Sequence, residues 1–331
     1  RDRSVSRGLG DVYKRQLFWF AFIFLDFGKP ILHCIKKRGI HMRFIDLHVH
    51  TTASDGSFTP SEVCQMALDK GLAALAITDH DTVDGVPEAI RFMENHQPAP
   101  DTQDSLPMEL IPGIELSCNY GSREIHILGF YMDYTNPGLL AELNALKDAR
   151  FNRNVEMCKL FQRDGIDMTI EKLQEGNPDT VITRAHFARV LIEDGIVKNK
   201  DQAFKKYLGE KCRYYLPKPE VTCERALSII NQYGKCAVLA HPLLYKLGYN
   251  QIEELLDYLK PLGLKGLEAY HSSNNSYESG KLRAIADRHD LFVSGGTDFH
   301  GVIKPDISLG TGRGGMRITT GILDNIKAHL F

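Results

Sequence analysis

The sequence lacks any pair of cysteines at the Cys-x-x-Cys spacing, although it contains seven cysteines in 331 residues. This argues against a zinc ribbon or a disulfide framework, and it predicts reduced thiols in a cytoplasmic protein. An excess of charge of one sign is also lacking, because the formal net charge is −2. We therefore expect no broad binding to nucleic acid and no stable binding of duplex DNA. A nucleotide held locally by metal ions and one or two arginines stays compatible with this balance.

A long hydrophobic run is missing too. The longest apolar run near the start, residues 17–25, has nine residues (LFWFAFIFL), whereas about 20 are needed to span a bilayer. Basic residues precede this run, but the following Asp26–Pro30 offers no small-residue cleavage site of a signal peptide. We expect residues 1–41 to be a leader that arose as a gene-start or assembly artefact, with a cryptic membrane anchor as the alternative. Met42 is then the expected start of the functional protein, which we do not expect to act on a membrane.

From Met42 onward, the pattern predicts an α/β protein with an insertion. Residues 42–136 and 224–331 alternate short apolar runs with amphipathic helices, as expected of parallel strands buried on both faces. Between them, residues 137–223 show almost no strand pattern and predict a helical subdomain that opens with one long helix. The parallel sheet is either open or closed into a barrel. In both architectures the chemistry lies at the C-terminal ends of the strands.

The stretch Phe44–Gly56 places two histidines one residue apart at the end of a predicted strand. Because residues i and i+2 of an extended chain point the same way, His48 and His50 can aim both imidazoles at one point. Two neighbouring histidines are compatible with a metal site and equally with packing or capping. The decision therefore depends on the rest of the chain.

Other histidines and carboxylates follow the ends of several further predicted strands. They are Asp55, His80, Glu115, His241, Asp298 and His300, and His126 joins them from within a strand. Packing alone does not readily explain why so many strands deliver such residues to one edge. Imidazole and carboxylate together suit Zn, Mn or Fe. Nine ligands exceed the needs of one ion, so we expect two or three divalent ions, an arrangement that in phosphoryl transfer stabilises both the attacking and the leaving oxygens.

Four motifs in this order resemble the PHP family, the polymerase and histidinol phosphatase metal-dependent phosphoesterases. They are Asp46–His50, Thr78–Asp81, Ala240–Pro242 and Gly296–His300, with Gly113–Glu115 and His126–Gly129 between them in the expected order. The resemblance covers the chain from Met42 to its end. It implies a distorted (β/α)7 TIM-like barrel and a metal-dependent hydrolase of phosphate esters.

The resemblance also implies how the ligands are shared. His48, His50, Glu115 and Asp298 would hold the first ion; Glu115, His126 and His241 the second; and Asp55, His80 and His300 the third. Some family members have histidine at the position of Asp55, so aspartate retunes the third site. The expected metal is Mn, with Zn or Fe as alternatives. Asp79 and Asp81 are expected to orient His80.

The helical insertion carries the segment Ile182–His186, which reads Ile-Thr-Arg-Ala-His. This segment resembles the subgroup of nucleoside 3′,5′-bisphosphate phosphatases and 5′-to-3′ exoribonucleases that trim short RNA. Arg184 offers a planar, two-pronged donor suited to phosphate, although an exposed arginine at a helix start is the plain alternative. His271 follows a strand and could contact the phosphate or protonate the leaving oxygen. We expect Arg184, His271 and Asp298 to be catalytic, the first two also to bind substrate, and His186 to be structural.

The expected substrate is a small nucleotide, above all a nucleoside 3′,5′-bisphosphate, or a short single-stranded RNA. Three other functions stay open at this point: a histidinol-phosphate phosphatase, a non-catalytic metal-binding module of a larger assembly, and a metal-dependent amide or C–N hydrolase. The last typically uses a bridging carboxylated lysine, and no lysine falls at a predicted strand end. The sequence gives no indication of an oligomeric state.

Overall fold

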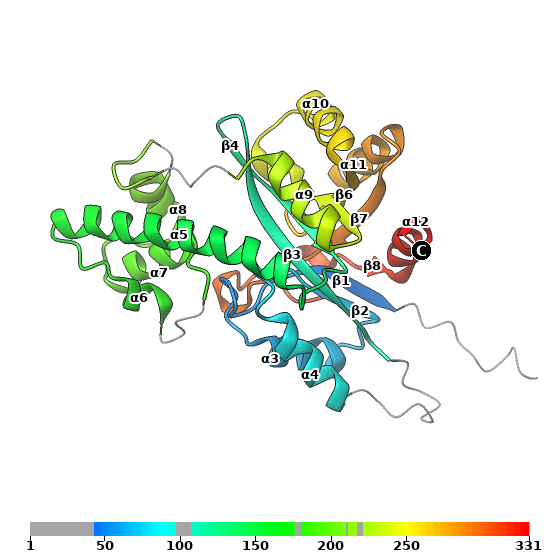
Figure 1. Cartoon of the computed structure of the whole chain (residues 1–331), viewed down its shortest axis with the longest axis horizontal. Helices are drawn as coiled ribbons and strands as arrows, with labels where there is room; N and C mark the ends of the chain where they lie inside the picture. Colours follow the sequence, from blue (N-terminus) through cyan, green and yellow to red (C-terminus); the bar gives the residue numbers. More distant parts are fainter. Residues whose placement is uncertain (1–42, 97–106, 176–179, 210, 217–220, 331) are drawn as a thin grey trace, which may run out of the picture. The chain divides into compact units, whose positions relative to one another are not determined.

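A computed structural model describes residues 43–96, 107–175, 180–209, 211–216 and 221–330 (Figure 1). The expected leader, residues 1–41, lies outside these ranges. Within them, no helix combines the length and the apolar character that a membrane crossing requires.

In the described residues, eight strands form one sheet in the order β7-β6-β5-β4-β3-β2-β1-β8. Their bounds are β1 Phe44–Val49, β2 Ala74–Ile77, β3 Glu109–Tyr120, β4 Arg123–Phe130, β5 Cys236–Leu239, β6 Leu264–His271, β7 Phe292–Gly296 and β8 Ile318–Thr319. The neighbours β1–β2, β2–β3, β5–β6 and β6–β7 are parallel, as the alternating pattern predicts. The expectation of a parallel sheet is wrong for β4, which runs antiparallel to both β3 and β5, and for the short β8, which runs antiparallel to β1.

The chain just after β7 returns to β1 and nearly closes the sheet into a barrel. The amide of Asp298 donates to the carbonyl of His48 at 2.9 Å, and the amide of His50 donates to the carbonyl of Phe299 at 3.0 Å. Gly296 permits this approach, because a Cβ atom there would lie 2.2 Å from the Cβ of His48. The predicted distorted TIM-like barrel is confirmed.

Of the helices in the ranges given above, six pack around this sheet: α3 Pro60–Asp69, α4 Val86–His96, α9 Cys223–Tyr233, α10 Tyr249–Leu259, α11 Ser276–Arg288 and α12 Thr320–Leu330. Helix α3 begins as its sequence predicts, with Pro60 in the first turn and a reciprocal capping box between Thr59 and Glu62. The strands are buried on both faces: in β2, Leu75 and Ile77 belong to one apolar cluster, and Ala74 and Ala76 belong to the other. This two-sided burial explains why β2 is a continuous apolar run.

The segment between β4 and α9 is helical in its described residues. It contains α5 Pro137–Arg163, α6 Ile170–Gln174, α7 Arg184–Glu193, α8 Lys200–Ala203 and a single π-helical turn, η1 Phe204–Leu208. The last turns of α5 and the shorter helices share an apolar core of their own, which includes Phe161, Phe187 and Leu191. Figure 1 shows these helices gathered about the far half of α5.

Candidate metal centre

Two histidines of the first strand meet at the edge of the barrel. His48 is the penultimate residue of β1, His50 follows the strand, and neither is exposed to solvent. Their Nε2 atoms lie 3.1 Å apart. The i and i+2 spacing therefore aims both imidazoles at one point, as the sequence predicts.

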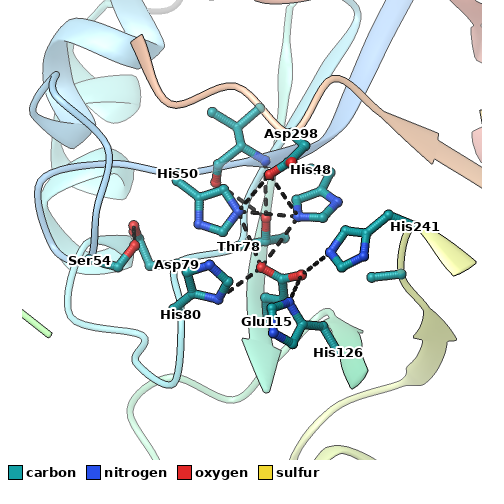
Figure 2. A network of polar contacts seen from close by, with 12 residues as sticks. His48, His50, Ser54, Thr78, Asp79, His80, Glu115, His126, His241 and Asp298 are labelled. Atoms are coloured by element: carbon teal, nitrogen blue, oxygen red, sulfur yellow. Dashed lines mark hydrogen bonds and ion pairs between the residues drawn. The ribbon is translucent and has the colours of Figure 1, made fainter. Parts of the chain in front are cut away.

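Glu115 of β3 lies at the centre of the cluster (Figure 2). Its Oε1 lies 2.9 Å from Nδ1 of His126 and 2.8 Å from Nε2 of His241. Its other oxygen, Oε2, lies within 3.4 Å of ring nitrogens of three further histidines: His48, His50 and His80. One carboxylate is thus shared by five imidazoles, a position suited to bridging two ions.

The antiparallel direction of β4 explains why His126 lies within a strand rather than after one. Strands β1, β5 and β7 reach the site with their C-terminal ends, β3 reaches it with its middle, where Glu115 lies, and β4 reaches it with its N-terminal half. His126 pairs with Ser117 of β3, and its carbonyl accepts from the amide of Ala240, which directly precedes His241.

Asp55, Asp298 and His300 complete the cluster on its other side. Oδ1 of Asp55 lies 3.2 Å from Nε2 of His300, and Oδ1 of Asp298 lies 3.4 Å from Nε2 of His50. All nine predicted ligands fall into four overlapping groups whose ligand atoms lie within 4.8 Å of one another. The groups are His48–His50–Asp298, His48–Glu115–His241, His80–Glu115–His126 and His50–Asp55–His80–His300.

Protein groups do not satisfy this cluster by themselves. Five of its buried polar atoms have no hydrogen-bond partner among the described residues: Nδ1 of His50, Oδ1 of Asp55, Nδ1 of His80, Oε2 of Glu115 and Nδ1 of His241. Nδ1 of His80 and Oε2 of Glu115 lie 2.9 Å apart, yet no hydrogen bond of acceptable angle joins them. Buried polar atoms are rarely left unpaired, so this donor set fits divalent ions.

The pKa values of the clustered side chains are shifted in opposite directions. Burial alone would raise the pKa of Glu115, but the charges of His80, His126 and His48 hold it well below its usual range. Burial lowers the pKa of His80 to about 3. Burial also opposes protonation of His50, yet the carboxylates of Asp298, Glu115 and Asp55 beside its ring raise that pKa to about 9. The metal-free cluster thus balances its carboxylates with protons, which bound cations would displace.

Glu268 of β6 is a functional candidate that the motifs did not indicate. It is fully buried, its Oε1 lies 2.9 Å from Nδ1 of His48, and its Oε2 accepts from the amide of His241 at 2.6 Å. A carboxylate behind a histidine fixes the tautomer that leaves Nε2 free for a metal. The available signal was an acidic residue inside an apolar strand.

The expectation that Asp79 and Asp81 orient His80 is wrong. Asp79 accepts from the amide of Thr51 at 2.7 Å and from the hydroxyl of Ser54 at 2.6 Å, so it fixes the loop after β1. Asp81 accepts from the amide of Ser117 at 2.8 Å and forms an ion pair with Arg150.

The two predicted catalytic residues outside the ligand set lie in different surroundings. Arg184 begins α7 and lines a cleft of about 950 Å³ over the cluster, with Nη2 3.5 Å from Oε1 of Glu124. His271 is 2% exposed and is absent from the lining of that cleft. Its Nε2 lies 3.3 Å from Oδ2 of Asp298, behind the cluster. Its geometry therefore favours orienting Asp298 over contact with a substrate.

The neighbours of Arg184 on the chain also reach the site. The hydroxyl of Thr183 donates to Oδ2 of Asp55 at 3.0 Å, which ties the helical insertion directly to the cluster. Nδ1 of His186 accepts from the amide of Thr183 at 2.9 Å, the structural role expected for this histidine. Lys304, which no motif indicated, lines the cleft with Nζ 2.5 Å from Oδ2 of Asp298.

Among curated proteins, the chain is 34% identical over 256 residues to the 5′-3′ exoribonuclease Rnm of Escherichia coli, which covers 77% of this chain and 84% of that protein. It is 34% identical over 261 residues to the 3′,5′-nucleoside bisphosphate phosphatase of Chromobacterium violaceum, covering 78% and 88%. It is 28% identical to the phosphoribosyl 1,2-cyclic phosphate 1,2-diphosphodiesterase of Eggerthella lenta, covering 77% and 94%.

Two solved structures share the fold. A protein of Chromobacterium violaceum, described as an amidohydrolase with bound sulfate and no metal, superposes with a TM-score of 0.73 at 30% identity. A proposed metal-dependent phosphoesterase of Bifidobacterium adolescentis gives a TM-score of 0.73 at 29% identity. Each match covers 87% of this chain and 97% of the other. The PHP domain model matches residues 46–260, so the resemblance drawn from the four motifs is confirmed: the chain belongs to the PHP domain family.

Proposed function

We propose that this chain is a metal-dependent phosphoesterase that removes the 3′-phosphate of nucleoside 3′,5′-bisphosphates, and that the same site trims short RNA from its 5′ end. The observation that carries the proposal is the convergence of eight imidazole and carboxylate side chains on Glu115. Five buried polar atoms of this nine-residue cluster have no hydrogen-bond partner among the described residues. The relatives named above, a phosphatase, an exoribonuclease and a phosphodiesterase, all cleave phosphate esters.

Two or three divalent ions, Mn²⁺ first, would be held by His48, His50, Asp55, His80, Glu115, His126, His241, Asp298 and His300. When bound, such ions lower the pKa of water and offset charge on a phosphoryl group. Glu115 turns its two oxygens to different histidines, so it would be the ligand shared between two ions. Glu268 and His271 orient His48 and Asp298 from behind, so the ligands need little reorganisation.

The remaining polar groups of the cleft act on the substrate. Arg184 binds phosphate through its guanidinium, whose carbon lies 5.8 Å from the ring centre of Phe204 and 5.7 Å from that of Tyr215. Lys304, with a side chain 25% exposed, places a cation beside Asp298 at the mouth of the cluster. Positive charge fixed at these positions stabilises the charge that develops on a phosphoryl group in the transition state.

The test is release of phosphate from adenosine 3′,5′-bisphosphate by purified protein with Mn²⁺. We expect turnover by the wild type and its loss in His48→Ala. His96→Ala is the matched control, because His96 is exposed at the end of α4. No phosphate release, or equal activity of all three proteins, would refute the proposal.

The other functions considered make different predictions. A histidinol-phosphate phosphatase would turn over histidinol phosphate faster than the nucleoside bisphosphate. For a non-catalytic module, the matching error-prone DNA polymerase of Mycobacterium tuberculosis aligns over 61 residues, 5% of its length, whereas the exoribonuclease aligns over 84% of its own. An amide hydrolase would be expected to have a carboxylated lysine at the centre of the cluster, whereas this chain has Glu115 there.

A further inference from the structure

Two cysteine side chains contact each other outside the metal centre. Cys118 lies in β3, and Cys223 is the first residue of α9, 105 positions later in the chain. Their sulfur atoms lie 3.6 Å apart, with the thiol of Cys118 donating to Sγ of Cys223. Both are thiols, and no disulfide joins them. Because the sulfur atoms of a disulfide are about 2.05 Å apart, two thiols at this distance need only small movements to form one.

The backbone beside the two thiols is already paired. The amide of Asn119 donates to the carbonyl of Val221 at 2.8 Å, and Asn119 forms a parallel bridge with Thr222. The thiol of Cys223 in turn donates to the carbonyl of Asn119 at 3.3 Å. The two chain segments are thus held together next to the sulfur atoms. Closing the remaining gap of about 1.5 Å requires rotation of side chains rather than a new backbone path.

The two thiols lie on the face of β3 that packs against α9, whereas the metal cluster lies on the other face. Cys118 follows Glu115 by three positions, so their side chains point to opposite faces of the strand. Cys118 and Cys223 both belong to the apolar core that includes Leu227 and Ile230 of α9. The thiols therefore form a site of their own, which takes no part in holding the ions.

Cys223 is suited to attack an oxidant. The hydrogen bond from Cys118 is the main reason why the pKa of Cys223 is lowered, and burial opposes this shift. By contrast, burial raises the pKa of Cys64, Cys158 and Cys236 to about 12. The thiolate is the nucleophilic form of cysteine, and the first turn of a helix favours it. Cys223 is thus the attacking sulfur, and Cys118 is the partner within reach of it.

The position of Cys223 also gives small oxidants a route to it. Its side chain is buried, but its neighbours Thr222 and Glu224 are exposed at the start of α9. The ends of helices open locally more easily than their middles. Opening of this one turn uncovers Cys223, so we expect oxidation by a molecule as small as hydrogen peroxide and slow reaction with bulky thiol reagents.

We propose that Cys118 and Cys223 form a reversible disulfide when the protein is exposed to a peroxide, and that this bond links the end of the helical insertion to β3. This site goes beyond the proposed function and does not depend on it. In a reducing cytoplasm such a disulfide is transient.

The reaction takes two steps. The thiolate of Cys223 attacks one oxygen of the peroxide, the O–O bond breaks, and the hydroxide that leaves takes up the proton that Cys223 released, so a sulfenic acid remains. The sulfur of Cys118 then attacks that of Cys223, the S–O bond breaks, and the thiol proton leaves with the hydroxyl group as water. Two thiols and one peroxide thus give one disulfide and two waters.

Peptide mapping of the full chain tests the bond directly. Reduced protein treated with hydrogen peroxide should yield two peptides joined through Cys118 and Cys223, lighter than the separate peptides by two hydrogen atoms, and dithiothreitol should separate them. Cys223→Ser should abolish this product. Cys212→Ser is the matched control, because Cys212 is half-buried in the helical insertion, and it should give the product as the wild type does. If peroxide oxidises Cys212 while Cys118 and Cys223 stay reduced, the proposal is overturned.

Thermal unfolding tests whether the bond links the two segments in the folded protein. The oxidised wild type should melt about 5–10 °C above the reduced wild type, because a cross-link over 105 positions restricts the unfolded chain. Peroxide should give Cys212→Ser the same increase and Cys223→Ser none. Equal melting temperatures of the oxidised and the reduced wild type would overturn the proposal.

Neither test depends on a single variant or on activity. The comparison of the oxidised with the reduced wild type needs no substitution, so it decides the proposal even where Cys223→Ser fails to fold. Both experiments use protein without substrate, so a failure of the proposed phosphoesterase function leaves their outcome unchanged.

Discussion

Replacing Glu268 by glutamine should weaken metal binding although Glu268 is not itself a ligand. Both of its partners donate: the amide of His241 to Oε2 at 2.6 Å, and Nδ1 of His48 to Oε1 at 2.9 Å. Glutamine offers one acceptor and one donor group in their place. The backbone amide of His241 cannot change its role, so the side-chain NH₂ must face Nδ1 of His48.

His48 would then have to accept at Nδ1 and carry its proton on Nε2, the atom that points toward His50 and Glu115. A protonated Nε2 cannot bind a metal. Loss of such a partner typically lowers metal affinity about 10- to 100-fold, or about 1.4 to 2.8 kcal/mol.

The assay is Mn²⁺ titration against a competing chromophoric chelator, at one pH, for the wild type, Glu268→Gln and the exposed control Glu94→Gln. A melting curve in EDTA shows that the variants are folded. If folded Glu268→Gln binds Mn²⁺ as tightly as the wild type, the argument that Glu268 sets the tautomer of His48 is wrong.

Three further predictions concern protons, chelation and barrel closure. Because the pKa values of His50 and His126 are raised to about 9 in the metal-free protein, both hold protons at neutral pH and must release them on binding metal. The apparent Mn²⁺ affinity should therefore rise as the pH approaches 9, and calorimetry in two buffers should detect proton release. A pH-independent affinity would contradict this prediction. EDTA should lower Tm, since metal at 100 times its Kd stabilises the fold by about 2.7 kcal/mol; an unchanged Tm would argue against a metal bound in the folded state. Asp46→Asn should cost about 1–3 kcal/mol in urea unfolding, because the buried carboxylate accepts from three donors after β7, and an amide NH₂ at Oδ2 would face the amide N–H of Gly310, which cannot accept. An unchanged unfolding midpoint would contradict this role.

The metal cluster could be predicted from the sequence because most of its ligands occupy the same kind of position, at or just after the end of a strand. His48, His80 and His241 each follow or end a strand, and the ends of parallel strands meet at one edge of a barrel. The local spacing of His48 and His50 and the convergence on Glu115 follow from this rule without knowledge of distances.

The apolar pattern of β4 did not indicate its antiparallel direction, because a buried strand shows the same pattern in either direction. The turn between β3 and β4 has only two residues, Gly121 and Ser122, and such a short connection requires antiparallel strands. That turn was the available signal, and it would have explained the place of His126.

The residues behind the ligands were harder to predict because their partners lie far along the chain. Glu268 contacts His48, a residue 220 positions away in the chain. Asp79 accepts hydrogen bonds from the loop after β1 and does not orient the adjacent His80. Adjacency in a motif suggested the wrong partner, since side chains that follow one another in extended chain point to opposite sides.

The central claim is that the cluster around Glu115 holds divalent ions on which phosphate-ester hydrolysis depends. The most direct measurement is phosphate release from adenosine 3′,5′-bisphosphate by chelator-stripped protein as Mn²⁺ is added, with bound metal counted in the same samples. We predict no turnover without metal and full activity when two or three ions are bound per chain. Full activity in excess EDTA, or metal bound without any phosphate release, would contradict the account.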